Sequence, residues 1–199
     1  MRRITVILAG GAFVAACTSG AAPTMPRQQL NYLRAASTAP PLANSVDSFW
    51  AVKGQSRRIR IYYQPAAPGG DSAQLLEFKV PQQALLRRPD GTLFATGDSI
   101  LIRVTVIDPV HLVVQFEPSG LTFSPSDPAQ FKFEFGETDD DINDDGQVNA
   151  TDDSLKAMLH LWRQETASDP WIQLTTTVNV STEEVEADIL GFTNYALAY

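Results

Sequence analysis

Residues 141–152 place oxygen-bearing side chains at a spacing that suits one hard cation. Loop positions one, three, five, nine and twelve are Asp141, Asn143, Asp145, Asn149 and Asp152, and position seven offers the backbone carbonyl of Gln147. Calcium takes six to eight such oxygen ligands, and a glycine at position six permits the sharp turn that the loop needs. The stretch therefore predicts a Ca²⁺ site with these six ligands, with Gly146 at the turn and Val148 pointing inward as the apolar contact of the loop.

The order of residue types adds a resemblance to this chemistry. With Asn at position three, Asp at five, a β-branched residue at eight, Asn at nine and Asp at twelve, the segment resembles the dockerin loop more closely than the usual EF-hand, which ends in Glu. A dockerin carries two such loops and docks on a cohesin through their helices, whereas this chain carries one. The alternative interpretation is an acidic surface turn that binds nothing.

Two predicted elements hold this loop. Phe131, Phe133 and Phe135 alternate with polar residues, which is typical of a strand with one buried face. After the loop, apolar residues recur at the spacing of an amphipathic helix, namely Leu155, Met158, Leu159 and Trp162. The sequence thus predicts a strand, the loop and a helix in succession, where an EF-hand has two helices.

The start of the chain carries an export pattern. Arg2 and Arg3 precede an apolar run, Ile4 to Ala16, that is too short for a permanent membrane span. Val14-Ala15-Ala16-Cys17 resembles the lipobox of bacterial lipoproteins, which implies that residues 1–16 are a signal peptide and that Cys17 is lipidated. The alternative is an apolar cysteine near a conventional cleavage site. As the only cysteine, it leaves no internal disulfide possible.

Residues 17–45 are expected to form the lipidated start and a flexible tether, because four prolines stand among small and polar residues without sustained periodicity. The lipid would place the protein at the bacterial cell envelope. Thr18 stands where an aspartate would signal retention in the inner membrane, which favours the outer membrane if the source is Gram-negative.

The charge balance excludes one class of partner. The formal net charge is −8, and removal of the signal with its two arginines lowers it to −10. No Lys or Arg occurs between Lys132 and Lys156, while nine carboxylates do. Such a cluster repels phosphate backbones, so nucleic acid is not expected as a partner.

Residues 46–199 are predicted to be one domain. Short runs with a period of two are separated by turn sequences such as Pro89-Asp90-Gly91 and Pro118-Ser119-Gly120, and the βαβ rhythm of a parallel sheet is missing. The expected fold is all-β, an antiparallel β-sandwich with the calcium loop and a short α-helix inserted at about 137–166.

A second resemblance supports this fold. Three short segments between residues 75 and 199 carry it: Val80 to Leu85, Phe116 to Phe123 and Gly191 to Leu197. They resemble the sandwich domain shared by zonula-occludens proteins, netrin receptors and ankyrins. Members of that group mostly serve as interaction or structural modules, so the resemblance implies no catalytic residues.

No constellation in the sequence predicts catalysis. His111 and His160 stand alone, a Gly-x-Ser-x-Gly elbow is missing, and the single cysteine is assigned to the lipid. A sugar-stacking face remains an alternative use of the aromatic residues, which are Trp50, Tyr62, Tyr63, Trp162 and Trp171.

The sequence accordingly favours a lipid-anchored, calcium-stabilised sandwich that serves as a structural or protein-binding module at the envelope and is not an enzyme. The second hypothesis is a carbohydrate-binding or polysaccharide-processing envelope protein. Its partner would be an envelope protein or polysaccharide besides the membrane, and the oligomeric state is left open.

Overall fold

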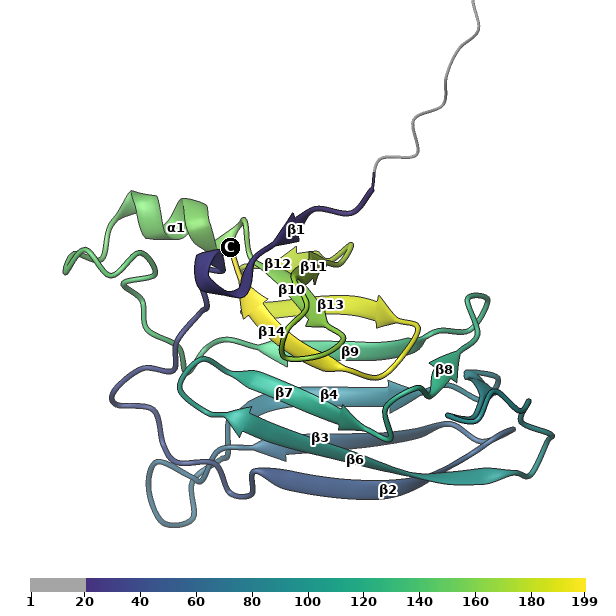
Figure 1. Cartoon of the computed structure of the whole chain (residues 1–199). Coiled ribbons are helices and arrows are strands. Elements are labelled where there is room, and N and C mark those ends of the chain that lie inside the picture. The colour runs from purple at the N-terminus through teal and green to yellow at the C-terminus, as the bar shows by residue number, and fades with distance from the viewer. Residues whose placement is uncertain (1–20) are drawn as a thin grey trace, which may run out of the picture.

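A computed structural model describes residues 21–199, so the predicted signal peptide and Cys17 lie outside the described residues. The described part is built almost entirely from strands (Figure 1). In chain order the elements are β1 (Thr24–Met25), the 3₁₀ turn η1 (Arg27–Gln29), β2 (Val46–Val52), β3 (Arg57–Tyr62), β4 (Gln74–Val80), β5 (Leu85–Arg87), β6 (Ser99–Asp108), β7 (Val113–Glu117), β8 (Thr122–Phe123), β9 (Ala129–Glu134), α1 (Ala150–Lys156), β10 (His160–Gln164), β11 (Trp171–Gln173), β12 (Thr177–Asn179), β13 (Glu184–Ile189) and β14 (Asn194–Ala198).

Two antiparallel sheets form the sandwich. The seven-stranded sheet has the order β1-β11-β10-β14-β7-β6-β2, and the five-stranded sheet has the order β12-β13-β9-β4-β3. Strands β5 and β8 pair as a small third sheet. The predicted all-β antiparallel sandwich is confirmed.

Aromatic side chains fill the space between the two sheets. Phe116 of β7 contacts Phe78 of β4, with ring centroids 4.9 Å apart, and Phe131 of β9 at 5.1 Å. Tyr195 of β14 lies edge-on to Phe116 at 5.3 Å. These four side chains are buried, and such edge-to-face pairs add stability beyond the area that they bury. The alternation of apolar residues along these strands therefore fixes which face of each sheet turns inward.

The predicted tether is wrong for residues 24–44, which form a segment that we call the strap. It packs across the sandwich and is hydrogen-bonded along its length. Leu33 N donates to Leu197 O at 2.9 Å, and Ala43 N donates to Tyr62 O at 2.9 Å. Leu30 and Leu33 are 6% and 1% exposed. The domain thus begins at β1, about twenty residues before the predicted boundary at 46.

The strap covers apolar side chains on the outer face of the seven-stranded sheet. There Trp162 and Trp171 form a second apolar cluster with Ala196, Ala198 and Leu30, apart from the main core. Tyr32 of the strap covers the edge of Trp171, with ring centroids 5.9 Å apart. Leu30 and Tyr32 therefore keep two tryptophans away from water.

The predicted amphipathic helix is wrong beyond Lys156. Helix α1 ends there, Met158 is exposed, and the next residues form strand β10, which pairs with β14. Successive side chains of β10 point to opposite faces of the sheet, so Leu161 lies in the main core and Trp162 lies on the outer face under the strap. Long-range pairing overrides the helical spacing of the apolar residues. The inserted segment consequently ends before residue 160, and not at about 166.

The other edge of the seven-stranded sheet is open. Strand β2 pairs only with β6, and its outer face exposes Trp50, which is 61% exposed. Asp47 Oδ1 accepts the backbone N–H of Ser48 at 2.7 Å. Inward- or edge-placed charges of this kind limit the pairing of an edge strand with another chain.

Burial of the strap leads to a stability prediction. Leu33→Ala should lower the free energy of unfolding by about 2–5 kcal/mol, because the side chain is fully buried and its removal leaves a cavity. Gln28→Ala, at an exposed position of η1, is the matched control and should leave it nearly unchanged. Urea unfolding of both variants measures the difference. Equal midpoints for Leu33→Ala and the parent protein would restore the tether interpretation.

Candidate metal centre

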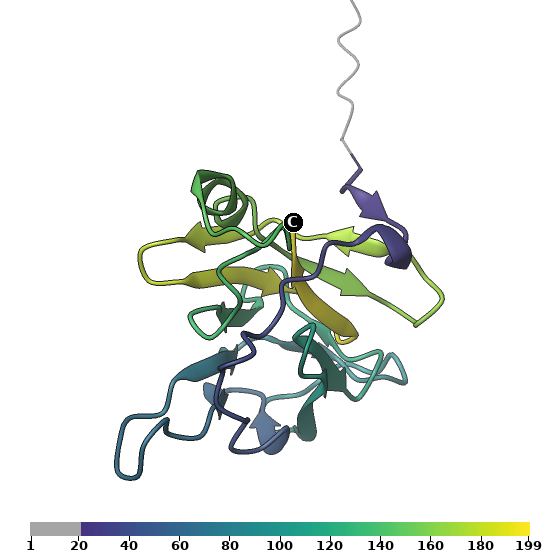
Figure 2. The ribbon, with the colours of Figure 1, turned by 90° about the vertical axis from the view of Figure 1, so that its left-hand side faces the viewer.

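The candidate metal loop joins the two sheets of the sandwich. It follows β9 of the five-stranded sheet and runs through α1 to β10 of the seven-stranded sheet. In Figure 2, the loop and α1 lie at the same end of the molecule as the C-terminus. The strap passes beside it, with Asp139 N donating to Arg34 O at 2.9 Å and Ala36 N donating to Glu137 O at 3.0 Å.

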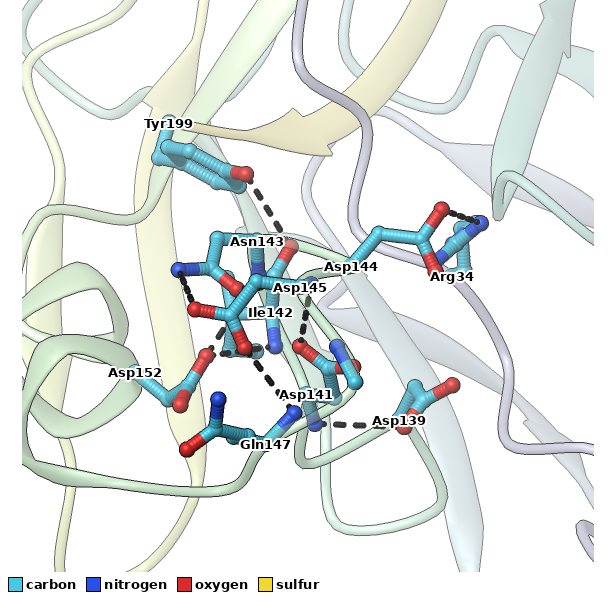
Figure 3. Close-up of polar contacts among 11 residues, drawn as sticks. Arg34, Asp139, Asp141, Ile142, Asn143, Asp144, Asp145, Gln147, Asp152 and Tyr199 are labelled. Carbon is cyan, nitrogen blue, oxygen red and sulfur yellow. Dashed lines mark hydrogen bonds and ion pairs between the residues drawn. The ribbon is translucent and has the colours of Figure 1, made fainter.

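The carboxylate and amide side chains of the loop turn onto its own backbone (Figure 3). The two Asp141 oxygens accept the N–H groups of Asp145 at 3.1 Å and of Gly146 at 2.7 Å. Asn143 Oδ1 also accepts from Asp145 N at 3.1 Å. Asp145 Oδ1 in turn accepts from Gln147 N at 2.9 Å. Gly146 has a φ of +84°, so the glycine supplies the turn that the spacing predicts.

Asp152 closes the loop from inside the protein. Its side chain is fully buried, and Oδ1 accepts from Ile142 N at 2.9 Å and from Asn143 N at 3.4 Å. Oδ2 accepts from Asn149 N at 2.8 Å. The bond from Asn149, followed by those from Asn143 and Ile142, lowers the pKa of this carboxyl below its ordinary value. One carboxylate thus ties the start of the loop to the start of α1.

Asn149 serves as the N-cap of α1. Its Oδ1 accepts from Thr151 N at 2.8 Å, and Asp152 completes the capping box by accepting from Asn149 N. Its Nδ2 donates to Gln147 O at 3.2 Å. The Gln147 carbonyl, predicted as the ligand of position seven, therefore accepts from Asn149 Nδ2, while Asn149 Oδ1 gives α1 the cap that a seven-residue helix needs.

The predicted apolar contact of the loop is at a different residue. Val148 is 67% exposed, so the prediction that it points inward is wrong. Ile142, at position two, is buried in the main core, and its carbonyl accepts from the Tyr199 hydroxyl at 3.0 Å. Since Asp152 holds the backbone of Ile142, this side chain is the one directed toward the core.

Two ion pairs fasten residues 139–145 to the strap and to α1. Arg34 of the strap pairs with Asp144 through Nη2 and Oδ1 at 2.7 Å and through Nη1 and Oδ2 at 3.1 Å. Lys156 Nζ lies 2.6 Å from Asp140 Oδ1. The hydrogen bond from Arg34 lowers the pKa of Asp144, and Asp144 raises the pKa of Arg34. The sequence did not predict this role of Arg34, because Arg34 and Asp144 are 110 residues apart in the chain.

The donor set fits calcium in type and order, because five side chains and one carbonyl offer uncharged or carboxylate oxygens. Each carboxylate oxygen that accepts one N–H keeps capacity for another partner. Among residues 21–199, however, no three His, Cys, Asp or Glu side chains are grouped as a metal site requires. The loop brings Asp141, Asn143 and Asp145 onto one turn and Asp152 beneath it, without gathering their carboxylates at one point.

Comparisons with known proteins give no relative for this chain. No family model matches the chain, and neither a curated protein nor a solved structure matches it. The resemblances to the dockerin loop and to the zonula-occludens sandwich remain predictions.

The histidines and tryptophans lie apart from the loop. His111 pairs with Asp108 at 2.9 Å, and His160 lies on β10, where its Nδ1 is 2.6 Å from the Thr176 hydroxyl. Trp162 and Trp171 are buried, and Trp50 is exposed at the far sheet edge. Helix α1 and the turn η1, the helical elements of residues 21–199, lack the length and the apolar character of a membrane span.

The Asp152 contacts predict a specific acid sensitivity. A carboxyl whose pKa is lowered on folding stabilises the folded state above its ordinary pKa of 3.8, and that stabilisation is lost as the pH falls further through the folded-state pKa. Asp152→Asn replaces one acceptor by an N–H₂ donor that faces backbone donors. With calcium chelated, it should lower the unfolding midpoint at pH 7 and reduce the loss of stability as the pH falls below about 4.

Asp153→Asn is the control, because Asp153 is exposed on the next position of α1. The same midpoint and the same acid profile for both variants would contradict the closing role of Asp152.

Proposed function

We propose that this protein is a lipid-anchored component of the bacterial cell envelope whose β-sandwich is stabilised by calcium and serves as a structural or protein-binding module. The observation that carries the proposal is the loop at 141–152. It joins the two sheets, carries Asp141, Asn143 and Asp145 along one turn, pairs with Arg34 of the strap through Asp144, and is hydrogen-bonded to Tyr199 through Ile142.

The proposed ligands are the Asp141, Asn143, Asp145 and Asp152 side chains, the Gln147 carbonyl and Asn149, the last directly or through water. Calcium bound there would reduce the repulsion among the carboxylates of residues 139–152, where Arg34 and Lys156 each pair with one carboxylate. Asp152 would contribute as a ligand while continuing to accept backbone N–H groups, because it is already held in place. Calcium would thereby fasten the corner at which the chain changes sheets.

The burial of the tryptophans supports a module over a sugar-binding protein. Trp162 and Trp171 lie under the strap, so they are not available to stack on a sugar ring. Trp50 alone is exposed, and it stands beside Leu101, with no carboxylate pair opposite it on β6.

Calcium binding predicts a stability gain. At a calcium concentration a hundredfold above the dissociation constant, binding to the folded state alone adds about 2.7 kcal/mol. With Asp at position twelve and a single loop, we expect the affinity of extracellular calcium modules, so the melting temperature should rise at millimolar calcium. Magnesium should have a smaller effect, because it demands a stricter geometry. Calorimetry on the calcium-free domain measures both ions.

Two variants separate ligand from charge effects. Asp145→Ala should abolish the heat of binding, whereas Asp144→Ala removes an equal charge from position four, which is not a ligand position, and should retain it. If both variants lost binding equally, or if the parent protein bound no calcium, the metal-site proposal would fail.

The lipid anchor predicts a processing defect. Cys17→Ser should abolish incorporation of a fatty-acid probe and leave the signal peptide uncleaved, because the thiol is the acceptor of the lipid. Thr18→Ser, at the next position, should preserve both. Gel mobility and metabolic labelling read the two outcomes, and an unlabelled parent protein would contradict the anchor.

A further inference from the structure

We infer that the end of the domain around β1 and the β11–β12 connection lies against the phospholipid surface that holds the lipid, while the β2 edge faces away from it. This inference rests on the proposed lipid attachment at Cys17. It follows from the length of chain between that residue and the first strand.

Few residues separate the predicted lipid from the folded domain. Six residues, Thr18 to Pro23, lie between Cys17 and the first residue of β1. Fully extended, the chain from Cys17 to Thr24 spans at most about 25 Å. A tether that ended at Val46 would instead reach about 100 Å, and any face of the domain could then touch the membrane.

The exit point of the chain is fixed in the fold. Thr24 and Met25 pair with Ile172 and Trp171, and Gln173 N donates to Pro23 O at 2.9 Å. Beyond β1, the buried Leu30 and Leu33 hold the strap in place. The spacer therefore starts at one edge of the seven-stranded sheet.

The distance across that sheet exceeds the reach of the spacer. Strands β1 and β2 are its two opposite edges, separated by six steps between neighbouring strands. At about 4.8 Å a step, they lie roughly 29 Å apart. Figure 1 shows β1 and β2 at opposite ends of the molecule. A spacer of about 25 Å is shorter than this separation, so the domain cannot stand on the surface with the β2 edge toward the lipid and β1 directed away from it.

The chemistry near the exit suits zwitterionic headgroups. A cleft of about 690 Å³ opens beside Ala22, and its walls carry both Lys79 and Arg163 and the carboxylates of Glu186 and Asp188. Phosphate and ammonium groups of a phosphatidylethanolamine surface can pair with both signs of charge. The occupant that we propose for this end of the domain is thus the surface of the bilayer that carries the anchor.

Site-specific quenching tests the orientation. Because Cys17 is consumed by the lipid, Thr175→Cys and Ser48→Cys each provide a single thiol, one in the β11–β12 connection and one on β2, both exposed. The lipidated full chain is labelled with a fluorophore and placed in phosphatidylethanolamine and phosphatidylcholine vesicles that contain a headgroup nitroxide. We expect quenching at position 175 to be several-fold stronger than at position 48. Thr177→Cys is a second near position if Thr175→Cys does not fold.

A longer spacer is the matched control. Insertion of twenty Gly and Ser residues after Gly20 should remove most of the difference between the two positions. Equal quenching at both positions with the native spacer, or an unchanged difference after the insertion, would overturn the orientation. Failure of the labelled chain to float with the vesicles would instead overturn the lipid anchor, and the orientation with it.

Discussion

The seven-stranded sheet has apolar side chains on both faces at its β10–β11–β14 end, and this constraint governs the molecule. The inner face packs in the main core through Leu161, Tyr195 and Leu197, while the outer face presents Trp162 and Trp171. An antiparallel sheet with one solvated face needs no outer cover, but two tryptophans in water would cost several kcal/mol. The strap supplies that cover, and it brings Arg34 beside the acidic loop.

The loop and the strap consequently form one unit. Arg34 pairs with Asp144, its carbonyl accepts from Asp139, and Tyr199 holds the carbonyl of Ile142. Because these contacts join segments from the start, the middle and the end of the chain, the loop is positioned by the whole domain. Partly exposed ion pairs contribute little individually, so the hydrogen bonds of the buried Asp152 are the stronger fixed element.

The sequence predicted most of the regular strands, because alternation along β4, β6, β9 and β13 depends only on local periodicity. It also predicted the turn at Gly146 from residue types at fixed spacing, and a helix next to the loop, although α1 begins at Ala150 within the loop and ends at Lys156. It missed β2, where Asp47 and Ser48 interrupt the apolar pattern, and β10, whose apolar residues match a helix. Strand pairing with β14 and β6 decides those two elements, and such partners are not visible in a local window. The strap was missed for the same reason, because its partners are distant in the sequence. The four prolines of residues 17–45 favoured a flexible tether, although Leu30 and Leu33 are buried.

The strap also constrains how the protein folds. It is the first described segment to be synthesised, yet its hydrogen-bond partners include Leu197 and Val110, and β1 pairs with β11. Contacts between residues so distant in the sequence close large loops and form slowly. The strap therefore docks only after the C-terminal strands are in place, and until then Trp162 and Trp171 stay uncovered. An unfinished chain would expose that apolar face to water, and docking of the strap would be the last step of folding.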